Sequence, residues 1–399
     1  MANQRVDVAI IGGGLVGASL ACALAPLIEH HNLSVAVIEA APLPDNSEGY
    51  QPSFDERASA IAYGSRLHFE QLQVWTALRE RASPIRHIHI SERGRFGATR
   101  LNANDVRLDA LGYVLPNAWI GRVLLDRLAQ LSLDWRCPAR VTEISPKPSG
   151  HRLVLDNGDV LDAGLTVLAD GGRSGLKEQL GIESVVEDYA QYALITNVEM
   201  GREHGGQAFE RFTPQGALAL LPLAGQRMEL IWTHRHDSLE RTLALDDRDF
   251  LRAIQHHFGD RVGRFRRVGK RFSYPLSLIQ AREQTRPHLA VLGNAAHALH
   301  PVAGQGFNLA LRGVMDLCAS LKTAIDEGHE LGGARAMADF ESRRARDRDQ
   351  VIRFSDGLIR LFGIDNPLFS HARAAGLIGL NLAPPLKRTL MRYAMGLER

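Results

Sequence analysis

Residues 6–39 constrain the fold of this chain more than any other stretch. The apolar residues 6–11 predict a buried parallel strand. An Ala- and Leu-rich run at 18–28 predicts a helix directly after it. Between the two stand glycines with Gly-x-Gly-x-x-Gly spacing, namely Gly12, Gly14 and Gly17. A strand, a glycine turn and a helix in this order are typical of a dinucleotide-binding βαβ unit.

The three glycines have different physical tasks. Gly12 permits the tight turn, Gly14 lets a pyrophosphate approach the backbone, and Gly17 lets the helix pack against the strand. A second strand at 34–38 ends at Glu39, 22 residues after Gly17. A carboxylate there accepts hydrogen bonds from the adenosine ribose hydroxyls and repels a 2′-phosphate. We therefore expect a site for FAD or NAD rather than NADP.

Composition sets outer limits on function. A chain of 399 residues predicts two or three domains. Its net charge of +2 gives no argument for nucleic acid as a partner. Its three cysteines, Cys22, Cys137 and Cys318, fit neither a disulfide framework nor a zinc site, which indicates a reducing cytosol. No apolar run reaches the ~20 residues that span a bilayer, so a membrane contact would be peripheral, on the inner face.

Further segments extend the predicted nucleotide sheet. Strand-like pieces at 139–162 contain a hairpin turn, and a strand at 165–168 is stopped by Asp170 and two glycines. Another strand is expected at 289–293. Residues 54–62 are expected to be a loop that feeds a helix to about Leu78, with a strand at 85–91 and a helix at 122–131. Arg57 lies in the loop before the first of these helices, and it is equally explained as a phosphate ligand or as a solvated arginine.

The sequence thus predicts an α/β fold: a Rossmann-like domain with an inserted sheet domain and a helical C-terminus. Strand-like pieces and a helix near 246–258 make residues 185–280 look like the insertion. The predicted boundaries are 1–80, 104–182 and 283–345 for the discontinuous nucleotide-binding domain, 81–103 and 183–282 for the substrate domain, and 346–399 for the C-terminal segment.

A second glycine-rich site follows the strand at 289–293. Gly304 and Gly306 precede a helix whose apolar stripe runs from Phe307 to Ile325. Glycines at a helix N-terminus again let the backbone approach a ligand. Two such sites on one sheet suit a long, two-ended cofactor. We expect FAD, with its adenosine end at Glu39 and its flavin end near residues 294–308.

These motifs together resemble the aromatic-ring flavoprotein monooxygenases, the family of p-hydroxybenzoate hydroxylase. The resemblance covers nearly the whole chain through residues 12–17 with Glu39, Asp170-Gly171, and 293–308. Within the family the chain looks most like the ubiquinone-biosynthesis hydroxylases, through Asp55-Glu56-Arg57-Ala58 and 300–308. Asn294, where most relatives have Asp, makes it look most like the branch acting on 2-polyprenyl-6-methoxyphenol.

The resemblance implies a role for each matching residue. It places Asn294 on the ribityl chain, His300, Pro301 and Gly306 in the loop at the flavin edge where catalysis occurs, and no metal. It implies FAD contacts from the following residues: Gly12, Gly14, Gly17, Glu39, Arg57, Arg122, Asp170, Asn294, Gly304, Gln305, Gly306, Phe307 and Asn308. In one departure, Gly313 replaces an acid that relatives often have in this helix.

The family's chemistry is hydroxylation of an electron-rich phenol ring by a C4a-hydroperoxyflavin, which forms from reduced flavin and O₂. The implied partners are a polyprenyl-phenol, O₂, NAD(P)H or another electron donor, and a ubiquinone-biosynthesis complex. Two alternatives remain open on the same fold. One is a flavin-dependent reductase or oxidase, which O₂-dependent product formation distinguishes. The other is a non-catalytic scaffold that keeps FAD, which substrate-coupled flavin turnover distinguishes.

Several side chains have more than one explanation. His297 and His300 suggest a metal pair, but no third ligand lies nearby in the sequence, and a structural hydrogen bond or phenol deprotonation also explains them. His256 and His257 are expected at a solvated helix end. Four aromatic residues are equally explained as pocket walls or as core, namely Tyr189, Tyr192, Phe212 and Trp232.

The C-terminal residues 373–399 combine leucines with basic residues around Pro384-Pro385. The segment is too short and too broken to span a bilayer. It suits either a peripheral contact with anionic head groups or an amphipathic helix packed on the protein.

Overall fold

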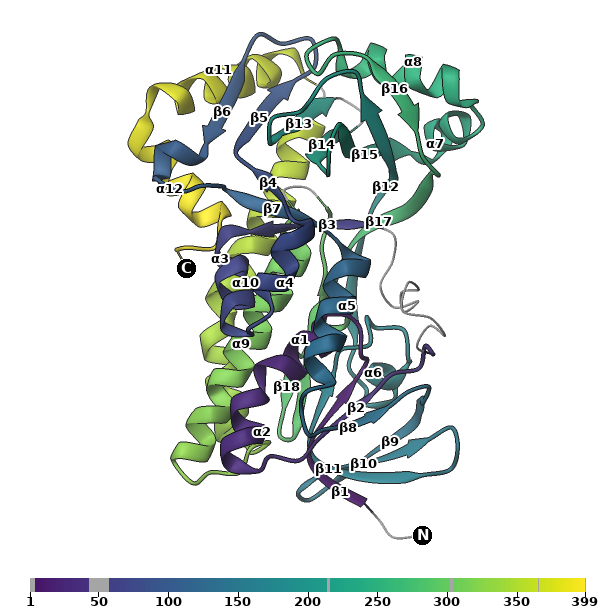
Figure 1. Cartoon of the computed structure of the whole chain (residues 1–399), viewed down its shortest axis with the longest axis vertical. Coiled ribbons are helices and arrows are strands. Elements are labelled where there is room, and N and C mark those ends of the chain that lie inside the picture. Colours follow the sequence, from purple (N-terminus) through teal and green to yellow (C-terminus); the bar gives the residue numbers. More distant parts are fainter. Residues whose placement is uncertain (1–3, 43–56, 214–215, 302–303, 365, 399) are drawn as a thin grey trace.

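The computed structural model describes residues 4–42, 57–213, 216–301, 304–364 and 366–398. The molecule is elongated, with one sheet in its lower half and a second sheet in its upper half (Figure 1). The long helix α10 (Ala334–Gly363) runs along one side and connects the two halves.

The lower sheet has the predicted β1 at its centre. β1 pairs in parallel with β2 on one side and with β11 on the other, and β11 pairs in parallel with β19. The strand order is β18-β19-β11-β1-β2-β8, and the antiparallel strands β9 and β10 extend it from β11. The bounds are β1 (Gln4–Ile11), β2 (Val35–Ile38), β8 (Asp134–Arg136), β9 (Val141–Lys147), β10 (Gly150–Leu155), β11 (Val160–Leu168), β18 (Thr285–Arg286) and β19 (Leu289–Val291).

Helices cover this sheet because their apolar sides share one core with its strands. Buried residues of α1, α5 and α9 pack with β1, β2 and β11 in the largest apolar cluster of the described chain. The helices of this half are α1 (Leu15–Ala23), α2 (Ala25–His31), α3 (Tyr63–Gln71), α4 (Trp75–Leu78), α5 (Asn117–Leu128), α6 (Leu176–Gln179) and α9 (Gln305–Asp326).

The glycine turn brings α1 very close to β1. Gly12 has φ +104°, and a Cβ at this position would lie 2.6 Å from the carbonyl oxygen of Ala169. A Cβ on Gly17 would lie only 1.8 Å from the carbonyl oxygen of Gly12. The two backbones therefore meet at a distance that only glycine permits, as the spacing predicts.

The upper sheet has nine strands in the order β20-β17-β12-β15-β14-β13-β5-β6, with β16 paired to β12. Its long central strand β12 pairs antiparallel with β15 and β17. Helix α8 covers one face of the sheet and α11 lies against β6. The bounds are β5 (His87–Glu92), β6 (Ala98–Asn102), β12 (Ser184–Met200), β13 (Gln207–Thr213), β14 (Gly216–Pro222), β15 (Arg227–Arg235), β16 (Phe265–Val268), β17 (Phe272–Ala281), β20 (His297–Ala298), α7 (His236–Leu243) and α8 (Asp247–Phe258).

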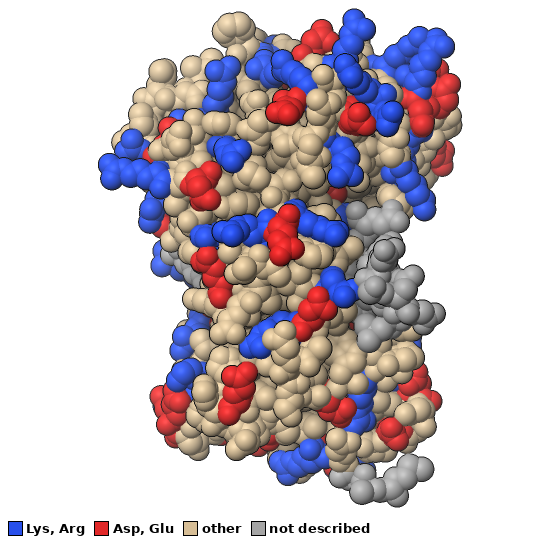
Figure 2. Space-filling view, in the orientation of Figure 1, with Lys and Arg blue, Asp and Glu red and all other residues tan. Residues whose placement is uncertain are grey.

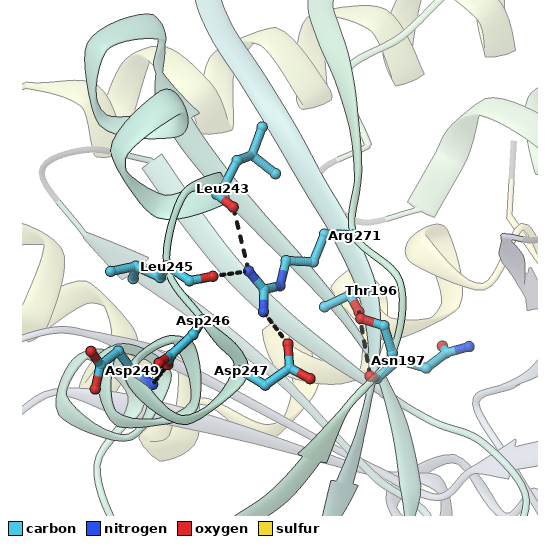
Figure 3. A network of polar contacts seen from close by, with 9 residues as sticks. Thr196, Asn197, Leu243, Leu245, Asp246, Asp247, Asp249 and Arg271 are labelled. Carbon is cyan, nitrogen blue, oxygen red and sulfur yellow. Dashed lines mark hydrogen bonds and ion pairs between the residues drawn. The ribbon is translucent and has the colours of Figure 1, made fainter.

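Arg271 attaches the start of α8 to this sheet (Figure 3). From the beginning of β17 its guanidinium donates to the carbonyl oxygen of Leu245 at 2.5 Å and forms an ion pair with Asp247. Asp246 caps the helix by accepting a hydrogen bond from the N–H of Asp249 at 2.7 Å. These contacts fix the helix whose far end carries His257.

A small three-stranded sheet lies between the two large ones, in the order β3-β7-β4. Here one prediction is wrong, because residues 58–62 form strand β3 and not a loop. The backbone of β3 pairs antiparallel with β7, so tertiary pairing overrides the low strand propensity of its alanines. The bounds are β3 (Ala58–Ala62), β4 (Ser83–Ile85) and β7 (Gly112–Pro116).

Other boundaries shift in smaller ways. The helix expected at 18–28 is two helices that meet at Leu24, and the helix expected to reach Leu78 is interrupted near Gln73, whose φ is +61°. The hairpin strand and the strand at 165–168 are one continuous strand, β11. The division into domains stays a prediction.

The C-terminal residues form α11 (Pro367–Leu382) and α12 (Pro384–Ala394). Arg373 makes a buried ion pair with Glu92 of β5 at 2.6 Å. Asn381 exchanges hydrogen bonds with the backbone of Ala98 and Arg100 in β6. This tail is therefore packed on the upper sheet. No helix among the described residues is long and apolar enough to cross a membrane.

We predict that Gly17→Ala destabilises the protein by about 1–3 kcal/mol, because the added methyl pushes α1 away from β1. Urea unfolding followed by circular dichroism measures the loss. Gly379→Ala in α11 is the matched control, since a Cβ there meets no atom within 4 Å and Ala favours a helix by roughly 0.5–1 kcal/mol. Equal stabilities of Gly17→Ala and wild type would contradict the proposed close approach.

Candidate functional site

The carboxylate of Glu39 is held beside the glycine turn. Its Oε2 accepts a hydrogen bond from the N–H of Gly13 at 2.7 Å, and its Oε1 accepts one from the N–H of Ala41 at 2.7 Å. Glu39 is only 6% exposed. The acid therefore lies next to Gly14, the N-cap of α1, as the motif predicts.

Asp170 orders the turn that follows β11 at the same edge of the sheet. Its carboxylate accepts hydrogen bonds from the N–H of Gly172 at 3.0 Å and of Ser174 at 2.9 Å. A Cβ on Gly12 would lie 2.8 Å from the Cα of Asp170, so the two turns touch. Ligands of parallel α/β sheets bind at this carboxyl edge.

The second glycine-rich segment approaches the first through α1. Gly293 has φ +61°, and a Cβ there would lie 2.9 Å from the Val16 side chain in the first turn of α1. Asn294 follows and is exposed. The structure thus brings the turn after β19 to the N-terminus of α1, although almost 280 residues separate them in the sequence.

Gly304 and Gly306 form the start of α9. Gly304 is the N-cap residue, with φ +59°. A Cβ on Gly306 would meet no atom of the described residues within 4 Å, so these residues leave open space beside the first turn of the helix. Residues 302 and 303 of the predicted loop lie outside the described residues.

Asn308 has a role that the sequence did not reveal. Its Oδ1 accepts a hydrogen bond from the N–H of Ala62, and its Nδ2 donates to the carbonyl oxygens of Ala60 and Gly304, all at 2.7–2.8 Å. The amide therefore joins β3 to the first turn of α9. Its side chain positions the loop, and contact with the cofactor stays a prediction.

Its neighbours in α9 also make contacts within the protein. Gln305 donates to the carbonyl oxygen of Ala394 at 3.2 Å, and the ring of Phe307 stacks against Phe69 with centroids 6.2 Å apart. These two side chains tie α9 to α12 and α3. The cofactor contacts expected of Gln305 and Phe307 likewise stay predictions.

The two predicted arginines lie in different surroundings. The Arg57 guanidinium sits 4.6 Å from the ring centroid of Tyr274, at the junction of the small and upper sheets. Arg122 is partly exposed on α5 and forms an ion pair with Asp126 at 3.0 Å. Asp55 and Glu56, which belong to the same predicted motif as Arg57, lie outside the described residues.

Both candidate histidines of the loop are buried and neutral. Burial and the neighbouring Arg344 hold the pKa of His297 well below its usual range, and its Nδ1 lies 3.1 Å from the Arg344 guanidinium. Burial lowers the pKa of His300 to about 4, and its ring packs edge-on against Tyr189 at 5.6 Å. His297 and His300 thus contact different residues, Arg344 and Tyr189. Pro301, the next residue of the loop, is half-buried.

The Arg344 guanidinium explains the glycine at position 313. A Cβ on Gly313 would lie 1.8 Å from its Nη1, so only glycine leaves room for this side chain. Arg344 is 1% exposed and donates to Gln284 at 3.2 Å, while its Nη1 has no hydrogen-bond partner in the described part of the chain. A side chain at position 313 would therefore require the Arg344 guanidinium to move.

Glu210 is a further group that the motifs did not indicate. In the strand ladder it stands between Ile90 and Ala219, on the same face as Phe212. Burial raises the pKa of Glu210 to about 7, so this carboxyl is partly protonated at neutral pH. The sequence contains one signal for this buried carboxyl. Ala208, Glu210 and Phe212 alternate onto the same face of β13, and Glu210 is the charged residue between the two apolar ones.

The four aromatic residues divide between core and other contacts. Trp232 is 3% exposed and lies in the core beneath α8, and Phe212 stacks on Phe362 of α10 at 3.6 Å. Tyr189 donates to Asp356 at 3.2 Å, and Tyr192 packs against His236.

Comparison with known proteins agrees with this geometry. Residues 5–355 match the family model described as an FAD binding domain. The chain is 36% identical to the ubiquinone hydroxylase UbiL of Rhodospirillum rubrum, over 99% of this chain and 90% of that protein. It is 31% identical to the 3-demethoxyubiquinol 3-hydroxylase of Escherichia coli, over 100% of both.

This chain belongs to the FAD-dependent monooxygenase family. Its fold also resembles the FAD complex of Klebsiella pneumoniae HpxO, with a TM-score of 0.75, 17% identity and coverage of 98% of this chain and 99% of that one. The residues present fit FAD, because Glu39 supplies a buried acceptor at one helix N-terminus and Gly306 leaves open space at another.

We predict that Glu39→Ala weakens FAD binding at least ten-fold, because a charge-assisted hydrogen bond is worth about 1.5–3 kcal/mol. Flavin fluorescence during titration of the apoprotein gives the dissociation constant. Glu29→Ala, at an exposed position of α2, is the control and should bind FAD normally. Unchanged affinity of Glu39→Ala would exclude the predicted ribose contact.

A second prediction concerns Glu210 and pH. Because its pKa is raised from 4.5 to about 7, the folded state holds a proton that the unfolded state releases, and stability falls as pH rises through this window. Glu210→Gln should therefore gain up to about 3 kcal/mol over wild type between pH 5 and pH 8. Urea unfolding of both proteins at pH 5 and at pH 8 measures the difference between their free energies of unfolding. Contributions from groups that titrate alike in the two proteins cancel in this difference. A pH-independent difference would show that Glu210 is not buried in this way.

Proposed function

We propose that this monooxygenase hydroxylates the aromatic ring of a polyprenylated phenol in ubiquinone biosynthesis, of the 2-polyprenyl-6-methoxyphenol type. The observation that carries the proposal is the 36% identity to a ubiquinone hydroxylase along nearly the whole chain. The E. coli relative, a 3-demethoxyubiquinol 3-hydroxylase, supports a prenylated quinol-type ring as the substrate class.

The surroundings of the glycine-rich helix N-terminus suit an apolar substrate. Ala208 and Leu221 of the upper sheet pack with Ala58 and Ala60 of β3. Ala60 in turn lies 3.1 Å from the position of a Cβ on Gly304. Apolar side chains thus continue from the upper sheet to the loop at α9, and they favour a phenol with a hydrocarbon chain over a charged benzoate.

Bound FAD supplies the oxygen chemistry, using O₂ and electrons from NAD(P)H or another donor. The N-terminus of α9 stabilises negative charge next to Gly306, and Asn308 holds this turn in place. His300 stays neutral at pH 7 and, with Pro301, borders the same loop. Exclusion of water by the apolar walls protects the reactive cofactor from unproductive decay. A ubiquinone-biosynthesis complex is the proposed setting.

We predict that the product carries one oxygen atom from O₂. The substrate is first identified as the quinone precursor that accumulates when the protein is removed from cells, and the purified enzyme then converts it under isotopically heavy O₂. Mass spectrometry should find one heavy oxygen in the product. An unlabelled product would exclude a monooxygenase and favour the reductase alternative.

The same assay tests the open space at Gly306. Gly306→Val should abolish hydroxylation while the protein stays folded, because no atom of the described residues lies within 4 Å of the new Cβ, whereas the added atoms enter the proposed flavin space. Gly376→Val, in equally open surroundings on α11, should remain active.

We also propose a peripheral membrane contact through the C-terminal helices. Ile378, Leu382 and Leu386 are 40%, 79% and 61% exposed on α11 and α12. Their positions suit partial insertion into the interface that holds a polyprenyl substrate. Lys387 is already paired with Asp105 at 2.7 Å, so the apolar residues and not this lysine make the contact.

Leu382→Ser with Leu386→Ser should lower binding to lipid vesicles at least ten-fold in a sedimentation assay, since each buried CH₂ contributes about 0.8 kcal/mol. Val186→Ser, at a 60% exposed position of β12, is the control. Point substitutions are preferable to removal of residues 373–399, because Arg373 and Met391 are part of the packed structure. If the double leucine variant binds vesicles as tightly as wild type does, this contact is excluded.

A further inference from the structure

A cluster of arginines lies where β5, β6 and β13 meet the end of α8. Strand pairing places His89 of β5 beside Arg100 of β6 and beside Phe209 of β13, two residues before Arg211 on the same face. The end of α8 faces this patch with His257, and Arg261 follows that helix. We call this set the arginine cluster: Arg93, Arg100, Arg211 and Arg261, with His89 and His257.

Two histidines act as neutral acceptors inside the arginine cluster. Arg93 lies 2.6 Å from Nδ1 of His257, and Arg261 lies 2.9 Å from Nε2 of His89. Burial and the neighbouring arginines lower the pKa of both imidazoles to about 4. His256 is exposed at the end of α8 as expected, whereas His257 is half-buried and paired with Arg93, so for His257 the expectation of a solvated side chain is wrong. At neutral pH the cluster carries the charge of four guanidinium groups.

No carboxylate within the described ranges neutralises the arginine cluster: none of its four arginines has an ion pair there, whereas Arg271, Arg312 and Arg373 each have one. Glu92, the last residue of β5 and the neighbour of Arg93 in the sequence, is paired with Arg373. The Nε of Arg211 is buried and has no hydrogen-bond partner in the described chain. Positive charges held together without a counter-ion repel one another, so an external anion would stabilise them.

The turn between β5 and β6 adds an exposed aromatic residue to this charge. Phe96 is fully exposed, between Arg95 and Gly97. A Cβ on Gly97 would lie 2.4 Å from the backbone of Ala374, so the turn is packed against α11 and cannot fold back over the ring. Lys and Arg side chains are numerous at this upper end of the molecule, with Asp and Glu side chains among them (Figure 2).

We propose that the arginine cluster and Phe96 form a binding site for the phosphate group of an anionic phospholipid. Guanidinium groups match phosphate oxygens in charge and geometry, and an exposed aromatic ring beside arginine is suited to the membrane interface. A free phosphate ion would use the same guanidinium groups but would gain nothing from the exposed ring. The inference rests on the proposed peripheral contact and adds a second, charged contact outside the C-terminal helices.

The test uses the full-length FAD-loaded protein and vesicles of phosphatidylcholine with or without phosphatidylglycerol. Arg100→Gln with Arg261→Gln changes two exposed arginines of the cluster. Because an arginine at an anionic surface contributes roughly five-fold to partitioning, this pair should weaken binding to phosphatidylglycerol vesicles at least ten-fold. Arg5→Gln with Arg140→Gln makes the same charge change at exposed positions of the lower half and should bind like wild type. Phe96→Ser, at a fully exposed position, should lower binding without affecting folding.

The outcomes separate the inference from the proposal on which it rests. If the cluster variant and Phe96→Ser bind anionic vesicles like wild type while the Leu382 and Leu386 variant does not, the arginine site is excluded and the C-terminal contact stands. If inorganic phosphate binds wild type but not the cluster variant, and neither vesicle binds, the site takes free phosphate and the lipid assignment is wrong. If wild type binds no vesicles and no phosphate, both proposals fail.

Discussion

The side-chain amide of Asn308 is the contact on which the geometry of the site depends. It satisfies the N–H of Ala62 and the carbonyl oxygens of Ala60 and Gly304 at once. β3 pairs only with β7 among the described strands, and β7 also pairs with β4. The amide thus fixes the helix N-terminus at Gly304 relative to the small sheet between the two halves. Removal of one partner would leave buried polar groups unpaired, at about 1–3 kcal/mol each.

The lower sheet could be predicted from the sequence because local rules determine it. A run of apolar residues, three glycines and an acid at a fixed distance leave little freedom, and Glu39 does lie beside Gly13. The helix expected near 246–258 and the strand expected at 289–293 are confirmed as α8 and β19, since their apolar patterns are clear, although β19 ends at Val291. The same motifs also predicted the family to which the chain belongs and FAD as its cofactor.

Features that depend on distant partners could not be predicted. β3 consists of small residues and is a strand only because β7 pairs with it. The histidine at the end of α8 looked solvated, since nothing local indicates that Arg93, 164 positions earlier, lies 2.6 Å away. Gly313 could not be interpreted until Arg344 was seen to occupy the space above it. Each case involves a side chain whose environment is supplied by another element.

Helix α10 contacts both halves of the molecule and helps to keep them in one arrangement. Its 30 residues correspond to a rod of about 45 Å at 1.5 Å per residue. About a third of the way along the helix Arg344 contacts His297 beside the glycine-rich loop, and near its C-terminal end Phe362 stacks on Phe212 of the upper sheet.

Between these points Asp347 makes a buried ion pair with Arg312 of α9 at 2.7 Å, and Asp356 accepts a hydrogen bond from Tyr189, which packs on His300. A continuous helix resists bending, so a shift of the upper sheet would have to break contacts at the loop as well. Helix α10 therefore couples the position of the upper sheet to the loop at α9, and the buried polar contacts along it help to hold both in place.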